Sequence, residues 1–430
     1  MRRSWVPLLL VGASLLVGGV VTASHTKAFS PYDEWVYYDY VTKIPTQFVV
    51  REGENIGPAA LEAMSCNGDT FGPRGEPCGG PYDKPSLYPQ AGKTSADLYT
   101  PLYFAVTWVV AKGVQFVTGT DLLTAARYSS LLWLSAGVWV FARALRKLRV
   151  PGIVALGLGL LVIAAPSTMY ANTYISTDAP ALLVGSLLLL FLLRFVRGEM
   201  SGWWLLIPAV VGILLKVANI VGIGAAFLIL VIYALSRWRR PPPANAPAPA
   251  KMMVVAAAMV AGSLAAELAW IMVRAALRVG AQPNQGLNGA INLRSLGALT
   301  TAFFPGSLGN PNDSLGIPGA VFAPIGWLVI AGVVGYLFGT RRWGVERAIG
   351  IATATASVFF APVLLIAMGI ALGAVAPVAD RYAMSLVPFM LACVAGILRN
   401  RIGRWGVVFY SVVICLATLF YAIRLIVIHA

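Results

Sequence analysis

Charged residues are scarce in this chain. They make up 11% of its 430 residues, whereas 58% are hydrophobic; a soluble globular protein carries about 25% charged residues. A single soluble core does not bury so much apolar surface, but a bilayer does. The apolar residues also form long runs, such as Ala179 to Leu193 and Val407 to Ile423, which approach or reach the length of a spanning helix. We therefore expect an all-α, polytopic membrane protein.

Histidine and cysteine are rare as well, with two and four residues. They form no cluster with the spacing of metal ligands, so no cofactor is predicted, although a divalent cation at the acidic pair described below is left open. Two of the cysteines fall within apolar segments. The other two, Cys66 and Cys78, share one polar loop, which predicts a disulfide if that loop lies outside the cytoplasm.

Acidic residues are the scarcer of the two charged classes. There are 17 Asp and Glu against 32 Lys and Arg, a formal net charge of +15. In a soluble protein this surplus would suggest a nucleic-acid partner. Here the basic residues lie between apolar segments, where they orient a membrane protein instead. We expect a membrane and no nucleic acid.

The apolar segments predict eleven crossings from a cytoplasmic N-terminus, with the first helix retained rather than cleaved as a signal peptide. The stretch 101–118 is expected to be a membrane-surface or re-entrant helix, because only then do most basic helix ends collect on the cytoplasmic side. The eleven segments are about 5–23, 122–145, 151–167, 178–196, 203–217, 219–236, 252–275, 317–339, 349–373, 382–398 and 406–427.

This topology divides the chain into five parts. Residues 1–23 form the first transmembrane helix, and 24–121 a long first extracytoplasmic loop that carries surface or re-entrant helices. Transmembrane helices two to seven occupy 122–275, a second extracytoplasmic loop 276–316, and helices eight to eleven 317–430. Any chemistry is expected at the extracytoplasmic face.

The acidic pair Asp33-Glu34 lies near the start of the first loop, and the part of that loop before the expected surface helix, about 24–100, holds ten of the 17 acidic residues. Ser30 suits the N-cap of a helix and Pro31 its first position. Asp33, three residues after Ser30, is then the second residue of a capping box, whose side chain bonds back to the N-cap amide. This is one interpretation of Asp33. Adjacent helical residues point about 100° apart, so the two acids are not expected to share a proton. The other interpretation makes Asp33 a reacting carboxylate and Glu34 its supporting group.

Several basic residues break the cytoplasmic bias and fall at outer helix ends or in the outer loops. Each either snorkels to lipid head groups or pairs with an acid, or they jointly surround a lipid-linked phosphate, which needs several donors in a partly dry site. Asp178 is either a helix cap with Thr177 or part of that site. The candidate phosphate ligands, in order of preference, are Arg381, Lys216, Arg127 and Arg294.

An acidic pair after the first helix, in a long outer loop, resembles the GT-C superfamily of polyprenyl-phosphate-sugar-dependent glycosyltransferases. Further motifs agree in order along the chain. Tyr99 to Tyr103 resembles a His-Pro-Pro-Leu-type motif without its His, Thr177 to Pro180 resembles the acidic turn before a later helix, and Asp380-Arg381-Tyr382 resembles the Arg-Tyr that begins a late one.

The resemblance implies transfer of a sugar, with inversion, from a polyprenyl-phosphate donor to a glycan or lipid acceptor of the cell envelope. Asp33 would be the general base, and Tyr382 would join Arg381 in binding substrate. Two alternatives remain. Glu267 lies inside an apolar segment, where an ionisable group is costly, and with the outer basic residues it fits a lipid or solute transporter. A non-catalytic scaffold of envelope assembly is the other.

Overall fold

The structure is a computed structural model that describes residues 5–238, 246–283, 293–304, 308–309, 315–340, 344–372 and 378–429. Within these ranges every regular element is a helix, and only isolated β-bridges occur besides. The predicted all-α fold class is therefore confirmed for the part of the chain that is described.

The α-helices follow one another with short 3-10 turns between some of them. Their bounds are α1 Val6–Ser24, α2 Glu34–Lys43, α3 Pro58–Cys66, α4 Pro101–Thr118, α5 Leu122–Lys147, α6 Gly152–Ala164, α7 Pro166–Thr173, α8 Ala181–Val196, α9 Leu206–Leu215, α10 Ile220–Arg237, α11 Pro249–Leu277, α12 Leu293–Leu299, α13 Ala323–Gly339, α14 Val345–Leu372, α15 Val387–Ile397 and α16 Arg401–His429.

Six helical segments among the described residues are long and apolar enough to cross a membrane: Val6–Ser24, Val217–Arg237, Pro249–Leu277, Gly319–Gly339, Val345–Ala367 and Arg401–Ile428. The number rises to 8 if each of two bent helix pairs is one span. Three further apolar helical segments, Ala181–Val196, Gly202–Leu215 and Val387–Ile397, are shorter. An integral membrane protein is thus supported, whereas the count of eleven crossings is not confirmed.

The helix α4 does not continue into α5, because the two meet at an angle of 115°. Thr100 caps α4 by accepting a hydrogen bond from the Leu102 amide, and Pro101 takes its first position. The last turn exposes 93% of Phe116 and 81% of Val117. Exposed apolar side chains at this helix end suit contact with lipid. The membrane-surface or re-entrant helix expected for 101–118 stays a prediction.

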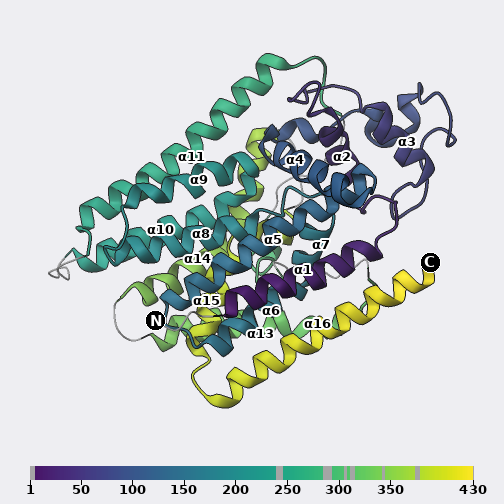
Figure 1. The fold of residues 1–430 in the computed structure, drawn as a ribbon. Helices are drawn as coiled ribbons and strands as arrows, with labels where there is room; N and C mark the ends of the chain where they lie inside the picture. Colours follow the sequence, from purple (N-terminus) through teal and green to yellow (C-terminus); the bar gives the residue numbers. More distant parts are fainter. Residues whose placement is uncertain are drawn as a thin grey trace.

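Figure 1 distinguishes the two ends of the bundle by the elements that lie there. The helix α1 runs from the end marked N to the end where α2, α3 and α4 lie, and α16 finishes towards that same end. We call the latter the loop end. Gly152, at the start of α6, lies against Val6, so the basic C-terminal turn of α5, with Arg146 and Lys147, belongs to the N-terminal end.

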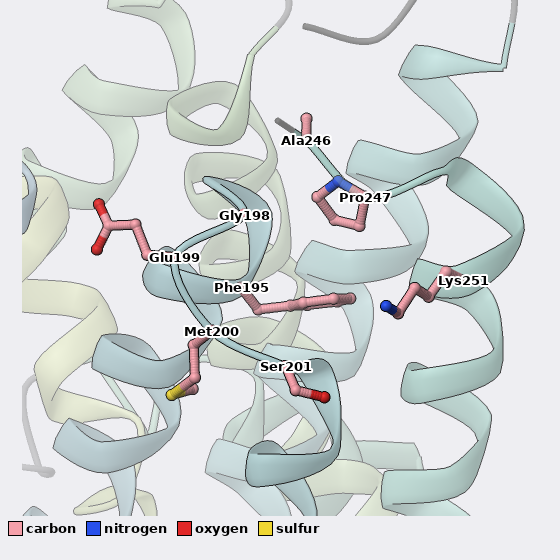
Figure 2. A pocket seen from close by; sticks show the side chains of 8 residues that line it. All are labelled: Phe195, Gly198, Glu199, Met200, Ser201, Ala246, Pro247 and Lys251. Carbon is pink, nitrogen blue, oxygen red and sulfur yellow. The ribbon is translucent and has the colours of Figure 1, made fainter. Parts of the chain in front are cut away.

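A hollow of about 430 Å³ opens at this N-terminal end, between the C-terminal end of α8 and the start of α11. Figure 2 shows the Phe195 ring reaching across it towards Lys251, whereas the Glu199 carboxylate turns away. That carboxylate pairs with Lys147 and with Arg194. The hollow is remote from the acidic pair at the loop end.

Two glycines bring α8 and α10 close to the chain that precedes α15. A Cβ atom added at Gly185 would lie 2.0 Å from the backbone oxygen of Ser385, and one added at Gly222 would lie 2.7 Å from it. The Gly222 amide also donates to the Ser385 hydroxyl at 3.0 Å. Since Ser385 follows the 3-10 turn Asp380–Ala383, this packing fixes the turn that carries Arg381.

We predict that Gly185→Ala destabilises the folded protein by about 1–3 kcal/mol, because overpacking forces backbone shifts. The matched control is Gly12→Ala on α1, where an added Cβ meets nothing within 4 Å. Thermal unfolding of both variants in detergent measures the difference. Equal melting temperatures would contradict the packing argument.

Candidate functional site

The first loop is fastened within itself and to α11. A disulfide joins Cys66 to Cys78, which confirms the predicted pairing. The Arg274 guanidinium of α11 reaches Asp97 at 2.7 Å and Glu52 at 3.1 Å. These contacts hold the loop against the loop end of the bundle.

The acidic pair begins a helix, but not in the way the sequence predicts. The helix α2 starts at Glu34, so the expected cap at Ser30 is wrong, and Asp33 occupies the N-cap position with φ 41° and no side-chain capping bond. The carboxylate that returns to the Ser30 amide is that of Glu34, at 2.7 Å. Proline at position 31 and the following bends leave Asp33 exposed at the surface. Within the described residues, no hydrogen bond or ion pair engages its carboxylate.

Glu34 is fully buried and completely partnered. Its two carboxylate oxygens accept hydrogen bonds from Nε and Nη2 of Arg127, each at 2.8 Å. They also accept from the amides of Ser30 at 2.7 Å and Ile175 at 3.0 Å. Arg127 donates further to the backbone oxygens of Thr26 and Ala28. Both oxygens of Glu34 are therefore taken.

Asp178 binds two cations from distant parts of the chain. One of its oxygens accepts from Lys216 Nζ at 2.6 Å and the other from Arg381 Nε at 3.0 Å. The α8 helix begins after it, at Ala181, so Asp178 uses its carboxylate for this pairing and not as the helix cap that was one interpretation. We call Asp178, Lys216 and Arg381 the Asp178 cluster.

Tyrosine rings enclose the two cations. The Arg381 guanidinium carbon lies 4.9 Å from the ring centre of Tyr32 and 5.7 Å from those of Tyr170 and Tyr382. Lys216 Nζ lies 4.9 Å from the ring centre of Tyr382. Rings at these distances attract cations and exclude water. The enclosure strengthens any electrostatic contact that the cations make there.

Two more tyrosines connect this enclosure to Asp33. The hydroxyl of Tyr37 donates to that of Tyr99 at 3.1 Å. Burial raises the pKa of both phenols. The neighbouring Tyr99 adds to the rise in the pKa of Tyr37, Tyr382 adds to the rise in the pKa of Tyr99, and the Asp33 carboxylate adds to both. Both phenols are therefore neutral donors at physiological pH, and the free carboxylate of Asp33 acts on the same ring system.

Opposing effects act on the Asp178 carboxyl. Burial alone would raise its pKa, but the charges of Lys216 and Arg381, with their hydrogen bonds, outweigh burial and hold the pKa below its ordinary value. Asp178 is thus ionised at neutral pH. One negative charge against two positive ones leaves the cluster with a surplus positive charge.

The other predicted residues fall in different places. Arg294 is exposed on α12. Glu267 is half-buried on α11, and in the described chain no ion pair joins it to Arg274, which binds Asp97 and Glu52 instead. The tyrosines around the cations were not predicted, apart from Tyr382. Tyr32 begins an aromatic run that could have signalled it, whereas Tyr170 lies in no such run.

Among the described residues, no group of three or more His, Cys, Asp and Glu has the geometry to hold a metal ion. The acidic pair does not form one either, because Arg127 and two backbone amides occupy the carboxylate of Glu34. Asp33 is left as the single free carboxylate of the pair.

No protein-family model matches the chain, and no curated protein does. Among solved structures it is similar to ArnT from Cupriavidus metallidurans in the apo state, with 18% identity over 93% of this chain and 60% of that one, at a TM-score of 0.49. It is also similar to the oligosaccharyltransferase of Archaeoglobus fulgidus in the apo form, with 14% identity over 99% of this chain and 56% of that one, at a TM-score of 0.45. The chain spans little more than half the length of these two proteins. The likeness is distant, so the function proposed below rests on the residues of the site.

We predict that Asp178→Asn lowers the free energy of unfolding by about 3 kcal/mol, because it leaves two largely buried cations without their counter-charge. Thermal unfolding at pH 7 measures the loss. The matched control is Asp83→Asn, an exposed acid of the first loop, which should leave the melting temperature unchanged.

The pH dependence of the melting temperature, compared between the wild-type protein and Asp178→Asn, tests the same pairing. Since the folded-state pKa of Asp178 is lowered, its contribution is complete above the unfolded value of about 3.9 and is lost as the pH falls through the folded value. The melting temperature of the wild-type protein should therefore drop more steeply below about pH 4 than that of Asp178→Asn. Parallel curves would contradict the assignment.

Proposed function

We propose that this protein is a glycosyltransferase that moves a sugar from a polyprenyl-phosphate donor to a hydroxyl of a cell-envelope glycan or lipid. The observation that carries the proposal is the combination at one place of an exposed, unpaired carboxylate, Asp33, and a tyrosine-enclosed pair of cations, Lys216 and Arg381. The motif resemblance to the GT-C superfamily supports the same reaction class.

The Asp178 cluster supplies what a phosphate monoanion or dianion needs. Arg381 offers Nη donors beyond the Nε that binds Asp178, and Lys216 offers further ammonium donors. Charge-assisted hydrogen bonds to phosphate are strong when both partners are shielded from water, and the tyrosine rings provide that shielding. The surplus positive charge also stabilises the negative charge that grows on the leaving phosphate.

Asp33 has the properties of the base in this reaction. The acceptor oxygen attacks the anomeric carbon, and its proton passes to the Asp33 carboxylate. The bond between the anomeric carbon and the phosphate oxygen breaks, and its electron pair stays on the phosphate held by Lys216 and Arg381. Attack opposite the leaving group inverts the anomeric carbon. Phosphate leaves readily, so the step needs no second acid.

The proposed orientation places the N-terminus in the cytoplasm and the loop end outside. The basic turns of α5 and α8, with residues such as Arg146 and Arg194, belong to the N-terminal end, as the positive-inside rule requires. The disulfide between Cys66 and Cys78 suits an oxidising compartment at the loop end. The lipid-linked donor then enters from the outer leaflet.

We predict that Asp33→Asn lowers the rate of sugar transfer by about 10²–10⁴-fold, because the acceptor loses its general base. Lipid and glycan analysis of a deletion strain first identifies the missing product, and purified protein is then assayed with a panel of radiolabelled polyprenyl-phosphate pentoses and hexoses. Asp83→Asn serves as the control. Near-wild-type transfer by well-folded Asp33→Asn would overturn the assignment of the base.

We predict that Arg381→Lys raises the KM for the donor by about tenfold, equivalent to about 1.4 kcal/mol, because lysine lacks the planar fork that pairs with Asp178 and phosphate together. The control is Arg278→Lys, which alters an exposed partner of Glu52 outside the Asp178 cluster. Donor titrations of both variants measure the effect. An unchanged KM for Arg381→Lys would remove this residue from the phosphate site.

A further inference from the structure

The Glu34–Arg127 pair joins three pieces of chain that are distant in sequence. Glu34 starts α2 and Arg127 belongs to α5. The Ile175 amide, which donates a hydrogen bond to the Glu34 carboxylate at 3.0 Å, lies in the turn that leads to Asp178. Side-chain exposure is 3% for Arg127 and 0% for Glu34. A bidentate, buried pair of this kind fixes the distance and the relative orientation of the two segments that carry Glu34 and Arg127.

The pair also closes the turn that presents Asp33. The Glu34 carboxylate holds the Ser30 amide four residues back. Arg127 holds the backbone oxygens of Thr26 at 2.6 Å and Ala28 at 2.7 Å. Asp33 lies inside this clamped segment with φ 41°, a left-handed conformation that is uncommon for residues other than glycine and that Asp adopts more readily than most.

Neighbouring side chains reinforce the same turn. The backbone oxygen of Tyr32 accepts from the hydroxyl of Ser30 at 2.8 Å and from that of Tyr170 at 3.2 Å. Tyr170 in turn packs against the Arg381 guanidinium. The turn that carries the free carboxylate is therefore connected to the Asp178 cluster on two sides, through Ile175 and through Tyr170.

From these contacts we infer that Glu34 and Arg127 are positioning residues for the proposed reaction, which hold Asp33 at a fixed place relative to the Asp178 cluster and do not touch donor or acceptor. This inference rests on the proposed function of Asp33 and the cluster. Arg127 then binds the carboxylate of Glu34, in place of the lipid-linked phosphate that its place in the sequence suggested.

The two roles predict different kinetics. A phosphate ligand affects donor affinity, whereas a positioning pair affects the rate of the chemical step. A displacement of the base by about 1 Å costs about 10²-fold in rate. We therefore expect Glu34→Gln and Arg127→Lys to lower kcat by about 10²-fold, while the KM for the donor stays within about threefold, since Lys216 and Arg381 keep their partner Asp178.

Hydrogen exchange of the intact protein in lipid nanodiscs supplies a readout that does not depend on activity. Glu34→Gln should accelerate amide exchange in the peptides around 26–34 and 174–178 together, because one carboxylate holds both. The matched control is Asp97→Asn, which removes another buried carboxylate of the first loop, paired with Arg274. It should accelerate exchange near 97 and 274 and leave the first two peptides and kcat unchanged.

Several outcomes decide the matter. Faster amide exchange in both peptides of Glu34→Gln, together with a reduced kcat and an unchanged donor KM, supports the inference. The inference would be overturned by unchanged exchange in the 174–178 peptide or by a kcat within twofold of that of the wild type. It would also be overturned if the donor KM rose as much in Arg127→Lys as in Arg381→Lys. If Asp33→Asn retains sugar transfer, the assignment of Asp33 as the base fails instead, and the exchange data alone then decide whether the pair couples the two segments.

Discussion

The pairing of Asp178 with two cations is the interaction on which the candidate site depends. It gathers the turn before α8, the junction of α9 and α10, and the 3-10 turn before α15 around one buried carboxylate. Burying three charges is costly unless each is paired and hydrogen-bonded. Here the tyrosine rings and the glycine contacts at Ser385 hold the partners in place. The three residues of the cluster carry two positive charges and one negative charge, which favours an anionic ligand beside Lys216 and Arg381.

Asp33 and Glu34 show how adjacent residues of the same charge acquire different properties. Since the helix begins between them, Glu34 points inward to Arg127, and Asp33 stays outside with its carboxylate free. Burial and four hydrogen bonds make Glu34 a fixed structural anion. Exposure and a left-handed backbone make Asp33 the accessible one, next to the neutral phenols of Tyr37 and Tyr99.

The sequence singled out residues that the structure brings together, but it did not predict their contacts. Composition and apolar runs predicted the helical membrane fold, and motif context singled out Asp33, Asp178 and Arg381. The predicted helix start at Ser30 was wrong. A Ser-Pro pair followed by acidic residues also occurs in a turn, and here the Ser30 amide donates to the carboxylate of Glu34 rather than to that of Asp33. Local spacing does not distinguish the two. The partner of Glu34, Arg127, lies 93 residues away, and only tertiary packing brings them together.

The enclosure of tyrosines was beyond sequence reasoning for the same reason, since Tyr32, Tyr170 and Tyr382 come from three separate parts of the chain.

The most direct test of the whole account is an experimental structure of the protein with a polyprenyl monophosphate bound. The account predicts the phosphate within hydrogen-bond distance of Lys216 and Arg381, on the side that faces Asp33. A phosphate bound elsewhere, such as beside Lys251 at the N-terminal end, with the Asp178 cluster vacant, would contradict it.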